Sequence, residues 1–273
     1  MRGPVRVLGS VARPVTTTAR RLSREPGLTI IGWHRVDGAS SDGLSTGVDD
    51  FRRNLDLLED WGATVLPLGA AVAALDEGIL PERAVSLTFD DGYASVVETA
   101  WPILRERGLT TTLFVVTGYL SGAGRFAWDR AEPEHDRHRL ASADELLAAA
   151  EEGLDLGSHT VTHPWLPRLD PDELKRELVE SRTAMEELLG RPVDQIAYPT
   201  GGWSPVVRAA AADAGYRIGV TVDRGLNTVR TPRLSLRRSF APTEAADLRL
   251  VLDGAYTLLR PLDTWRRRRG PSW

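Results

Sequence analysis

The sequence predicts an α/β fold in a single domain, with parallel strands that form a closed or distorted barrel. Short runs of apolar and β-branched residues alternate with stretches of helical periodicity along most of the chain. Strands that are nearly continuous in apolar residues are typical of a parallel sheet covered on both faces, and repeated strand–helix units favour right-handed crossovers. The 273 residues suit one such domain, because a single α/β barrel takes about 250 residues.

The expected strands are 28–33, 63–66, 84–89, 111–116, 154–157, 195–198, 217–222 and 233–237. The expected helices are 51–58, 96–104, 142–150, 170–190 and 205–215. Two of these helices have clear end signals: Ser142 and Glu145 form a capping box, and Asp170 with Pro171 starts a helix that Gly190 ends. Residues 117–141 break the alternation with a long polar insertion, which is either a functional lid or disordered; His135 and His138 within it are expected to be solvated.

Composition excludes several classes of protein. The chain has no cysteine, so disulfides and thiolate ligands are absent and any metal must be held by nitrogen and oxygen. The net charge of −4 gives no reason to expect a nucleic-acid partner. Neither a secretory signal nor an apolar run of about 18 residues is recognised. We therefore predict a cytoplasmic protein, with peripheral membrane attachment as an alternative.

Both termini are strongly basic. Residues 1–27 hold six arginines against one acid, Glu25, and four consecutive arginines occupy 266–269. We expect a basic extension at 1–27, a barrel at 28–260 and a basic tail at 261–273. Three interpretations stay open: solvated tails, peripheral contact with an anionic membrane through arginine and tryptophan, and, for the N-terminus, an organellar transit peptide.

Two polar motifs follow apolar strands. Asp90 and Asp91 come directly after the strand at 84–89, and Gly92 lets the backbone leave the strand abruptly. His159 and His163 follow the strand at 154–157 with i, i+4 spacing. Catalytic groups of a parallel barrel lie where strands end, so these four side chains are expected to meet. Three would bind a divalent cation, and the remaining carboxylate would act as a base. Helix capping by the aspartates and surface histidines are the structural alternatives.

The expected metal is Zn²⁺, with Co²⁺ or Ni²⁺ as substitutes, because one carboxylate and two imidazoles form a mixed oxygen and nitrogen ligand set. Residues 88–93 (TFDDGY) and 158–163 (SHTVTH) resemble the first two motifs of the polysaccharide deacetylases, the nodulation-type N-deacetylases of carbohydrate esterase family four. The resemblance extends from about Leu28 to Arg238. It implies a distorted (β/α)7 barrel, a hydrolase that removes N-acetyl groups from sugars, Asp90 as general base, and Asp91, His159 and His163 as metal ligands.

The third family motif departs from its usual form. It normally reads Arg-x-Pro-Tyr-Gly, whereas this chain has Ala197-Tyr198-Pro199-Thr200-Gly201. This version is similar to the branch that acts on poly-N-acetylglucosamine. The backbone N–H of Thr200 is the expected oxyanion donor. The family arginine orients the base, and its loss leaves two interpretations: Arg237 or Arg238 supplies the guanidinium, or these are surface residues.

The general acid is expected near the N-terminus. The usual late Leu-x-His motif is missing, since no histidine follows His163. Trp33-His34-Arg35-Val36 resembles the (Tyr/Trp)-His-x-Val motif of the poly-N-acetylglucosamine branch, which implies His34 as general acid; sheet capping is the structural alternative. The candidates for contact with a sugar are Tyr93, Tyr198, Trp203, Arg237 and Arg238, with Trp33 and Trp128 as further stacking candidates.

The predicted function is that of a metal-dependent hydrolase that removes N-acetyl groups from an N-acetylated amino sugar, glycan or glycoconjugate. Its expected partner is therefore an N-acetylated saccharide. Two alternatives stay open: a non-catalytic carbohydrate-binding relative, because Ala197 and Thr200 replace family groups, and a deacylase of a small or lipid-linked N-acyl metabolite.

Overall fold

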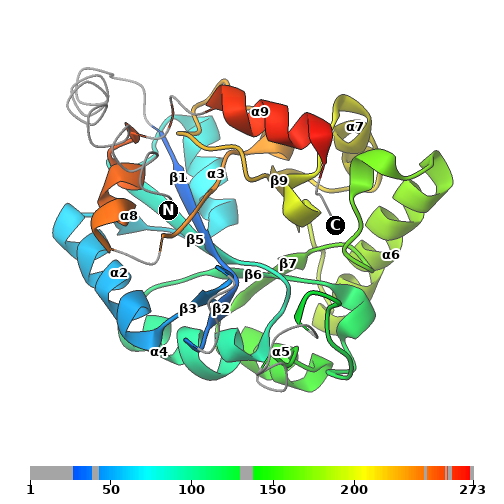
Figure 1. The fold of residues 1–273 in the computed structure, drawn as a ribbon, viewed down its shortest axis with the longest axis horizontal. Coiled ribbons are helices and arrows are strands. Elements are labelled where there is room, and N and C mark those ends of the chain that lie inside the picture. The colour runs from blue at the N-terminus through cyan, green and yellow to red at the C-terminus, as the bar shows by residue number, and fades with distance from the viewer. Residues whose placement is uncertain are drawn as a thin grey trace.

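The computed structural model describes residues 27–38, 43–129, 138–242, 245–255, 257 and 260–270. Nearly all of the expected basic extension at 1–27, and His135, lie outside the described residues. The described chain forms a distorted (β/α)7 barrel in one domain, in which a curled parallel sheet is surrounded by helices (Figure 1). The predicted fold class is confirmed.

The main sheet has the strand order β10-β1-β5-β6-β7-β8-β9, with β4 also paired to β5, and these pairings are all parallel. Its strands are β1 (Thr29–Trp33), β4 (Thr64–Val65), β5 (Ala84–Phe89), β6 (Thr112–Val115), β7 (Asp155–Ser158), β8 (Gln195–Ala197), β9 (Ile218–Val220) and β10 (Ser239–Phe240). A small separate sheet joins β2 (Arg35–Val36) to β3 (Ser45–Thr46). Every residue of β1 and β5 is buried, as expected for strands inside a barrel.

The strand expected at 233–237 is wrong. A 3₁₀ turn, η7 (Arg233–Ser235), occupies that segment, and the strand β10 follows it. The side-chain oxygen of Asn227 accepts a hydrogen bond from the Arg237 N–H at 2.7 Å, and its amide nitrogen donates one to the Arg237 carbonyl at 2.8 Å. These backbone groups therefore pair with a loop instead of a strand. Leu236 forms a single parallel bridge to Val220, which links β9 to the segment before β10.

Helices cover the outside of the sheet (Figure 1). They are α2 (Val48–Trp61), α3 (Leu68–Glu77), α4 (Trp101–Glu106), α5 (Ala143–Glu151), α6 (Pro171–Leu189), α7 (Pro205–Asp213), α8 (Ala245–Leu252) and α9 (Arg260–Arg269). A π-helical turn, η1 (Val96–Ala100), precedes α4. The capping box of α5 is present, α6 begins at Pro171 after its N-cap Asp170, and Gly190 ends α6 in the left-handed conformation; these predictions are confirmed. Glu173 also forms a capping box with Asp170.

The start of the expected C-terminal tail belongs to helix α9. Asp263 of this helix is buried and accepts the N–H of Arg224 at 3.1 Å, so α9 rests on the barrel. Leu262 and Trp265 remain about half exposed on it. No helix in the described part of the chain is long and apolar enough to cross a bilayer. Membrane contact through the termini stays a prediction.

Candidate active site

The acidic pair lies at the carboxyl end of β5, where the chain turns sharply. Asp91 has φ 74° and Gly92 has φ 81°, two successive left-handed conformations. A Cβ atom on Gly92 would lie 3.3 Å from Val115 Cγ1, so glycine suits this position for its conformation and for its lack of a side chain. The turn breaks strand alternation, and both carboxylates are buried at the same end of the barrel, each 3% exposed.

Asp91, His159 and His163 form one cluster. Asp91 Oδ1 lies 3.4 Å from His159 Nε2 and 3.5 Å from His163 Nε2, and the three ligand atoms lie within 4.8 Å of one another. Two atoms each bound at about 2.0–2.1 Å to a tetrahedral Zn²⁺ are about 3.3–3.4 Å apart. Asp91 Oδ1 is also buried without a hydrogen-bond donor among the described residues. The donor set and its spacing therefore fit a divalent metal.

The ring of His159 is oriented by the neighbouring strand. Its Nδ1 lies 2.7 Å from the carbonyl oxygen of Ala197, at the end of β8. A proton on Nδ1 satisfies that carbonyl and leaves the Nε2 lone pair directed at the cluster, an arrangement typical of metal-binding histidines. Burial lowers the pKa of His163 to about 4, which keeps this ring neutral and able to coordinate.

Asp90 is held by a buried arginine. Arg238 Nη1 and Nη2 each donate to one carboxylate oxygen of Asp90 at 2.6 Å, and Arg238 is 1% exposed. Nη1 also donates to Thr88 Oγ1 at 3.2 Å, and Nε to the Thr221 carbonyl at 3.3 Å. Burial acts to raise the pKa of Asp90, but Arg238 and His159 outweigh it, so the pKa lies below its usual value. Asp90 is therefore an oriented carboxylate.

His34 follows β1 directly and is half-buried at the same end of the barrel. Its ring stacks on Phe240 of β10, with ring centroids 4.5 Å apart. Burial lowers the pKa of His34, although Asp91 and Asp90 act in the opposite direction. Trp33 and Phe89 lie opposite each other in the parallel register of β1 and β5, and the Asp90 N–H donates to the Trp33 carbonyl at 3.0 Å, so His34 and Asp90 follow adjacent strand ends.

Thr200 lies in the short 3₁₀ turn η6 (Pro199–Gly201), directly after β8. It adopts φ 51° and is exposed. Its hydroxyl donates to the Pro199 carbonyl at 2.8 Å. The turn begins two residues after Ala197, whose carbonyl oxygen lies 2.7 Å from His159 Nδ1.

The other expected sugar contacts have hydrogen-bond partners within the protein. Tyr93 and Tyr198 are completely buried, and their hydroxyls donate to Asp129 and to the Leu234 carbonyl. Both rings are packed in the core and present no exposed surface; their contact with a sugar stays a prediction. Trp203 is half-buried and donates to Asp223 at 3.2 Å. Arg237 donates to the Leu226 carbonyl at 2.7 Å, so Arg238 is the arginine that meets Asp90.

Part of the polar insertion packs against His163. The ring of Trp128 lies 5.0 Å from that of His163, and its Nε1 donates to Tyr93 Oη at 3.2 Å. The next residue, Asp129, is buried and forms an ion pair of 2.5 Å with the buried Arg35. The sequence alone assigned no role to Arg35 or Asp129. The adjacent Trp128 and Asp129, an aromatic residue and an acid within a polar segment, were the only local indication that this part of the insertion is packed.

His138 corrects the expectation for this insertion. It was expected to be solvated, but it is completely buried, with Nδ1 3.6 Å from Asp129 Oδ1. The pairing of Arg35 with Asp129 explains the difference, because it anchors a polar segment inside the protein.

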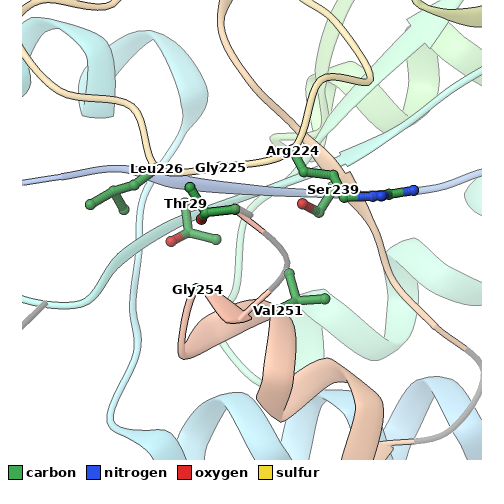
Figure 2. Close-up of a pocket in the computed structure, with 8 residues that line it drawn as sticks. Thr29, Arg224, Gly225, Leu226, Ser239, Val251 and Gly254 are labelled. Atoms are coloured by element: carbon green, nitrogen blue, oxygen red, sulfur yellow. The ribbon is translucent and has the colours of Figure 1, made fainter. Parts of the chain in front are cut away.

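A surface hollow lies on another part of the barrel. Figure 2 shows it between β1, the loop at Arg224–Leu226 and the end of α8, where Thr29, Ser239, Val251 and Gly254 contribute to its lining. None of its lining residues belongs to the acidic pair or the histidine cluster. We assign it no part in the chemistry.

Comparisons with known proteins agree with this geometry. Residues 77–219, just over half of the chain, match the family model described as polysaccharide deacetylase. The chain belongs to the polysaccharide deacetylase family. The matched region contains Asp90, Asp91, His159 and His163, while His34 and Arg238 lie outside it.

Individual relatives are distant. The chain is 26% identical over 199 residues to YxkH of Bacillus subtilis (strain 168), covering 72% of this chain and 65% of that protein. It is 28% identical over 135 residues to the chitooligosaccharide deacetylase of Bradyrhizobium sp. (strain ANU 289), covering 49% of this chain and 53% of the relative. The chain thus spans less than two thirds of either relative's own length.

Among solved structures, the Streptococcus pyogenes deacetylase PplD in complex with acetate is similar with a TM-score of 0.72. The match covers 84% of this chain and 99% of that one, at 24% sequence identity. At that identity the likeness establishes the barrel fold alone.

Proposed function

We propose that this chain is a metal-dependent hydrolase that removes N-acetyl groups from an N-acetylated amino sugar, glycan or glycoconjugate. The observation that carries the proposal is the meeting of Asp91, His159 and His163 beside Asp90, which Arg238 fixes in place. Binding a sugar alone requires no oriented base next to a metal-ligand set.

Asp91, His159 and His163 would hold the cation. A divalent metal in such a site supplies Lewis acidity towards the acetyl carbonyl and lowers the pKa of a nearby water. The ligand residues come from the ends of two strands, β5 and β7, which the sheet holds in fixed register through β6.

Asp90 takes the proton from the attacking water. Its carboxylate lies with Oδ2 4.0 Å from His159 Nε2, and Arg238 keeps it ionised. The guanidinium fills the role of the arginine that the third motif lacks, and it reaches the base from the segment before β10 instead of from β8. Because the ion pair is bidentate, it fixes the direction as well as the charge of the base.

Two further groups complete the reaction. The Thr200 backbone N–H donates a hydrogen bond to the oxyanion that develops on the acetyl group. His34, in its protonated form, gives a proton to the leaving amine; burial opposes this form, and the carboxylates of Asp91 and Asp90 favour it. The products are acetate and a free amino sugar.

Because one relative is named as a chitooligosaccharide deacetylase, short N-acetylglucosamine oligomers are the first substrates to test. The Zn²⁺-loaded protein should release acetate from them. Asp90→Asn should still bind Zn²⁺, because Asp90 is not a proposed ligand, but should lose acetate release, since the amide cannot accept the proton. It should also be less stable than the parent, because the buried Arg238 loses its counter-charge. Parental acetate release by this variant would exclude Asp90 as the base, and a protein that binds Zn²⁺ but deacetylates no sugar would exclude the proposed activity.

A further inference from the structure

The loop that carries both histidines is held in an unfavourable backbone conformation. Thr160 has φ 69° and His163 has φ 62°, and neither is glycine. The left-handed conformation is sterically unfavourable for a residue that carries a Cβ atom. Residues of this kind persist where their surroundings determine the conformation. The loop after β7 must therefore be stabilised by contacts from outside it.

The strongest of these contacts comes from Glu177 on α6. Glu177 Oε2 accepts the N–H groups of Val161 and Thr162 at 2.8 and 3.0 Å, and Oε1 accepts the Thr162 hydroxyl at 2.6 Å. Glu177 is 5% exposed. No ion pair to it occurs in the described ranges of the chain, so its carboxylate is compensated by donors from the loop. Burying a carboxylate is costly without such donors, which ties this residue to the loop.

Helix α6 also fixes the strand end that precedes the loop. Ser181 lies one turn after Glu177, and its hydroxyl is 2.9 Å from that of Ser158, the last residue of β7. Ser158 Oγ in turn accepts the Thr160 N–H at 3.2 Å, and Thr160 Oγ1 accepts the N–H of His163 at 3.1 Å. The N-terminal capping box and Gly190 define the two ends of α6. Side chains of α6 thus contact the strand end before the loop and the middle of the loop.

We propose that Glu177 is a positioning residue for the metal site: it fixes the loop so that the imidazoles of His159 and His163 meet Asp91. It acts through the backbone and touches neither the ion nor a substrate. The inference rests on the metal site of the proposed function.

The arrangement of donors predicts which substitutions the site tolerates. One oxygen, Oε2, accepts both backbone N–H groups, so the single carbonyl oxygen of glutamine can keep them. The glutamine amide would then donate to Thr162 Oγ1, whose hydroxyl can rotate to accept. Methionine fills a similar volume but has no strong acceptor, so the loop would lose the three hydrogen bonds to Glu177. It would keep the hydrogen bonds from Thr117 and Gly118 to the Thr160 and Val161 carbonyls.

The test is Zn²⁺ affinity, measured by competition with a chelating dye on metal-free protein of confirmed fold. Glu177→Met should weaken Zn²⁺ binding by about 10–100-fold, the usual effect of losing a partner that orients metal ligands. Glu177→Gln should bind close to the parental level. Glu180→Met, the same change at an exposed position of α6, is the matched control and should bind as the parent does.

Parental affinity in folded Glu177→Met would overturn the proposal, as would a Glu177→Gln loss equal to that of Glu177→Met. If Glu177→Met does not fold, Thr162→Val removes one donor and leaves α6 intact; it should bind Zn²⁺ more weakly, and parental binding would overturn the proposal. If the parent protein binds no Zn²⁺, the proposed metal site is excluded, and the positioning role with it. If the parent binds Zn²⁺ and the variants differ in affinity as expected, but the parent releases no acetate, the positioning role of Glu177 holds and the proposed activity fails.

Discussion

At the scale of single residues, the site depends on buried charges that are neutralised locally. Asp90 and Arg238 are both almost inaccessible to solvent, and their two 2.6 Å hydrogen bonds use both carboxylate oxygens. Such a pair adds little net stability compared with apolar residues, but removal of one partner leaves an uncompensated charge. The arginine therefore matters for the direction and ionisation of the base, and its loss should affect activity and stability together.

Arg238→Met tests this dependence. We expect the free energy of unfolding to fall by about 3–5 kcal/mol, because the carboxylate of Asp90 is left buried and unpaired. Acetate release should be lost with it. Urea denaturation and the acetate assay measure the two effects.

The neighbouring Arg237 provides the control. Arg237→Met removes a hydrogen bond to the Leu226 carbonyl and should leave the rate of acetate release unchanged. A rate equally low in both variants would show that the arginine contact to Asp90 is not the cause.

At the scale of elements, the start of α5 is linked by hydrogen bonds to the insertion that precedes it. The capping box of α5 is reinforced by Arg139, whose guanidinium donates to both carboxylate oxygens of Glu145 at 2.9 and 2.6 Å. Arg139 lies just before this box, at the end of the insertion that packs on His163. The helix start and the insertion are therefore stabilised by the same carboxylate.

Stability should depend on pH through Glu145. Hydrogen bonds from Arg139 lower the pKa of this carboxyl to about 2, against about 4.3 in an unfolded chain. A lowered pKa stabilises the fold above the unfolded value, and the contribution disappears as the pH falls from about 4.3 towards 2. The side chain is 36% exposed, so solvent screening keeps the effect small.

Glu145→Gln should therefore unfold at lower urea concentration than the parent at pH 7, and the difference should shrink as the solution is acidified. Glu151→Gln, an exposed change on the same helix, should follow the parental pH profile. A constant difference between Glu145→Gln and the parent at every pH would contradict the assignment to this carboxylate.

At the scale of the whole molecule, the metal site would connect parts of the barrel that are distant in sequence. Asp91 follows β5 and both histidines follow β7, while α6 and β8 support the histidines from outside. A cation bound here would stabilise the native state alone, because the unfolded chain does not bring these ligands together.

Zn²⁺ should therefore raise the melting temperature, and a chelator should reverse the shift. The stabilisation is about 2.7 kcal/mol when free metal is 100 times the Kd. His163→Ala removes one ligand and should greatly reduce the shift, which thermal unfolding followed by circular dichroism would measure. An equal shift in this variant would indicate that Zn²⁺ binds elsewhere.

Local signals in the sequence determined the alternation of strands and helices, the capping box of α5, the ends of α6, and the two motifs that follow β5 and β7. Each depends on neighbouring residues, so it can be recognised from spacing alone. The parallel order of strands then implied that the motifs meet, because the carboxyl ends of parallel strands lie at one end of the barrel. The cluster of Asp91, His159 and His163 has that arrangement.

Tertiary structure decided which side chains complete the site. The sequence left Arg237 and Arg238 as equal candidates, and only the packing of the segment before β10 places Arg238 on Asp90, 148 positions away. It also buried Tyr93 and Tyr198 and set Glu177 under the histidine loop. Periodicity tells which residues share a face of one element, whereas the partner of a buried charge depends on how several elements pack together.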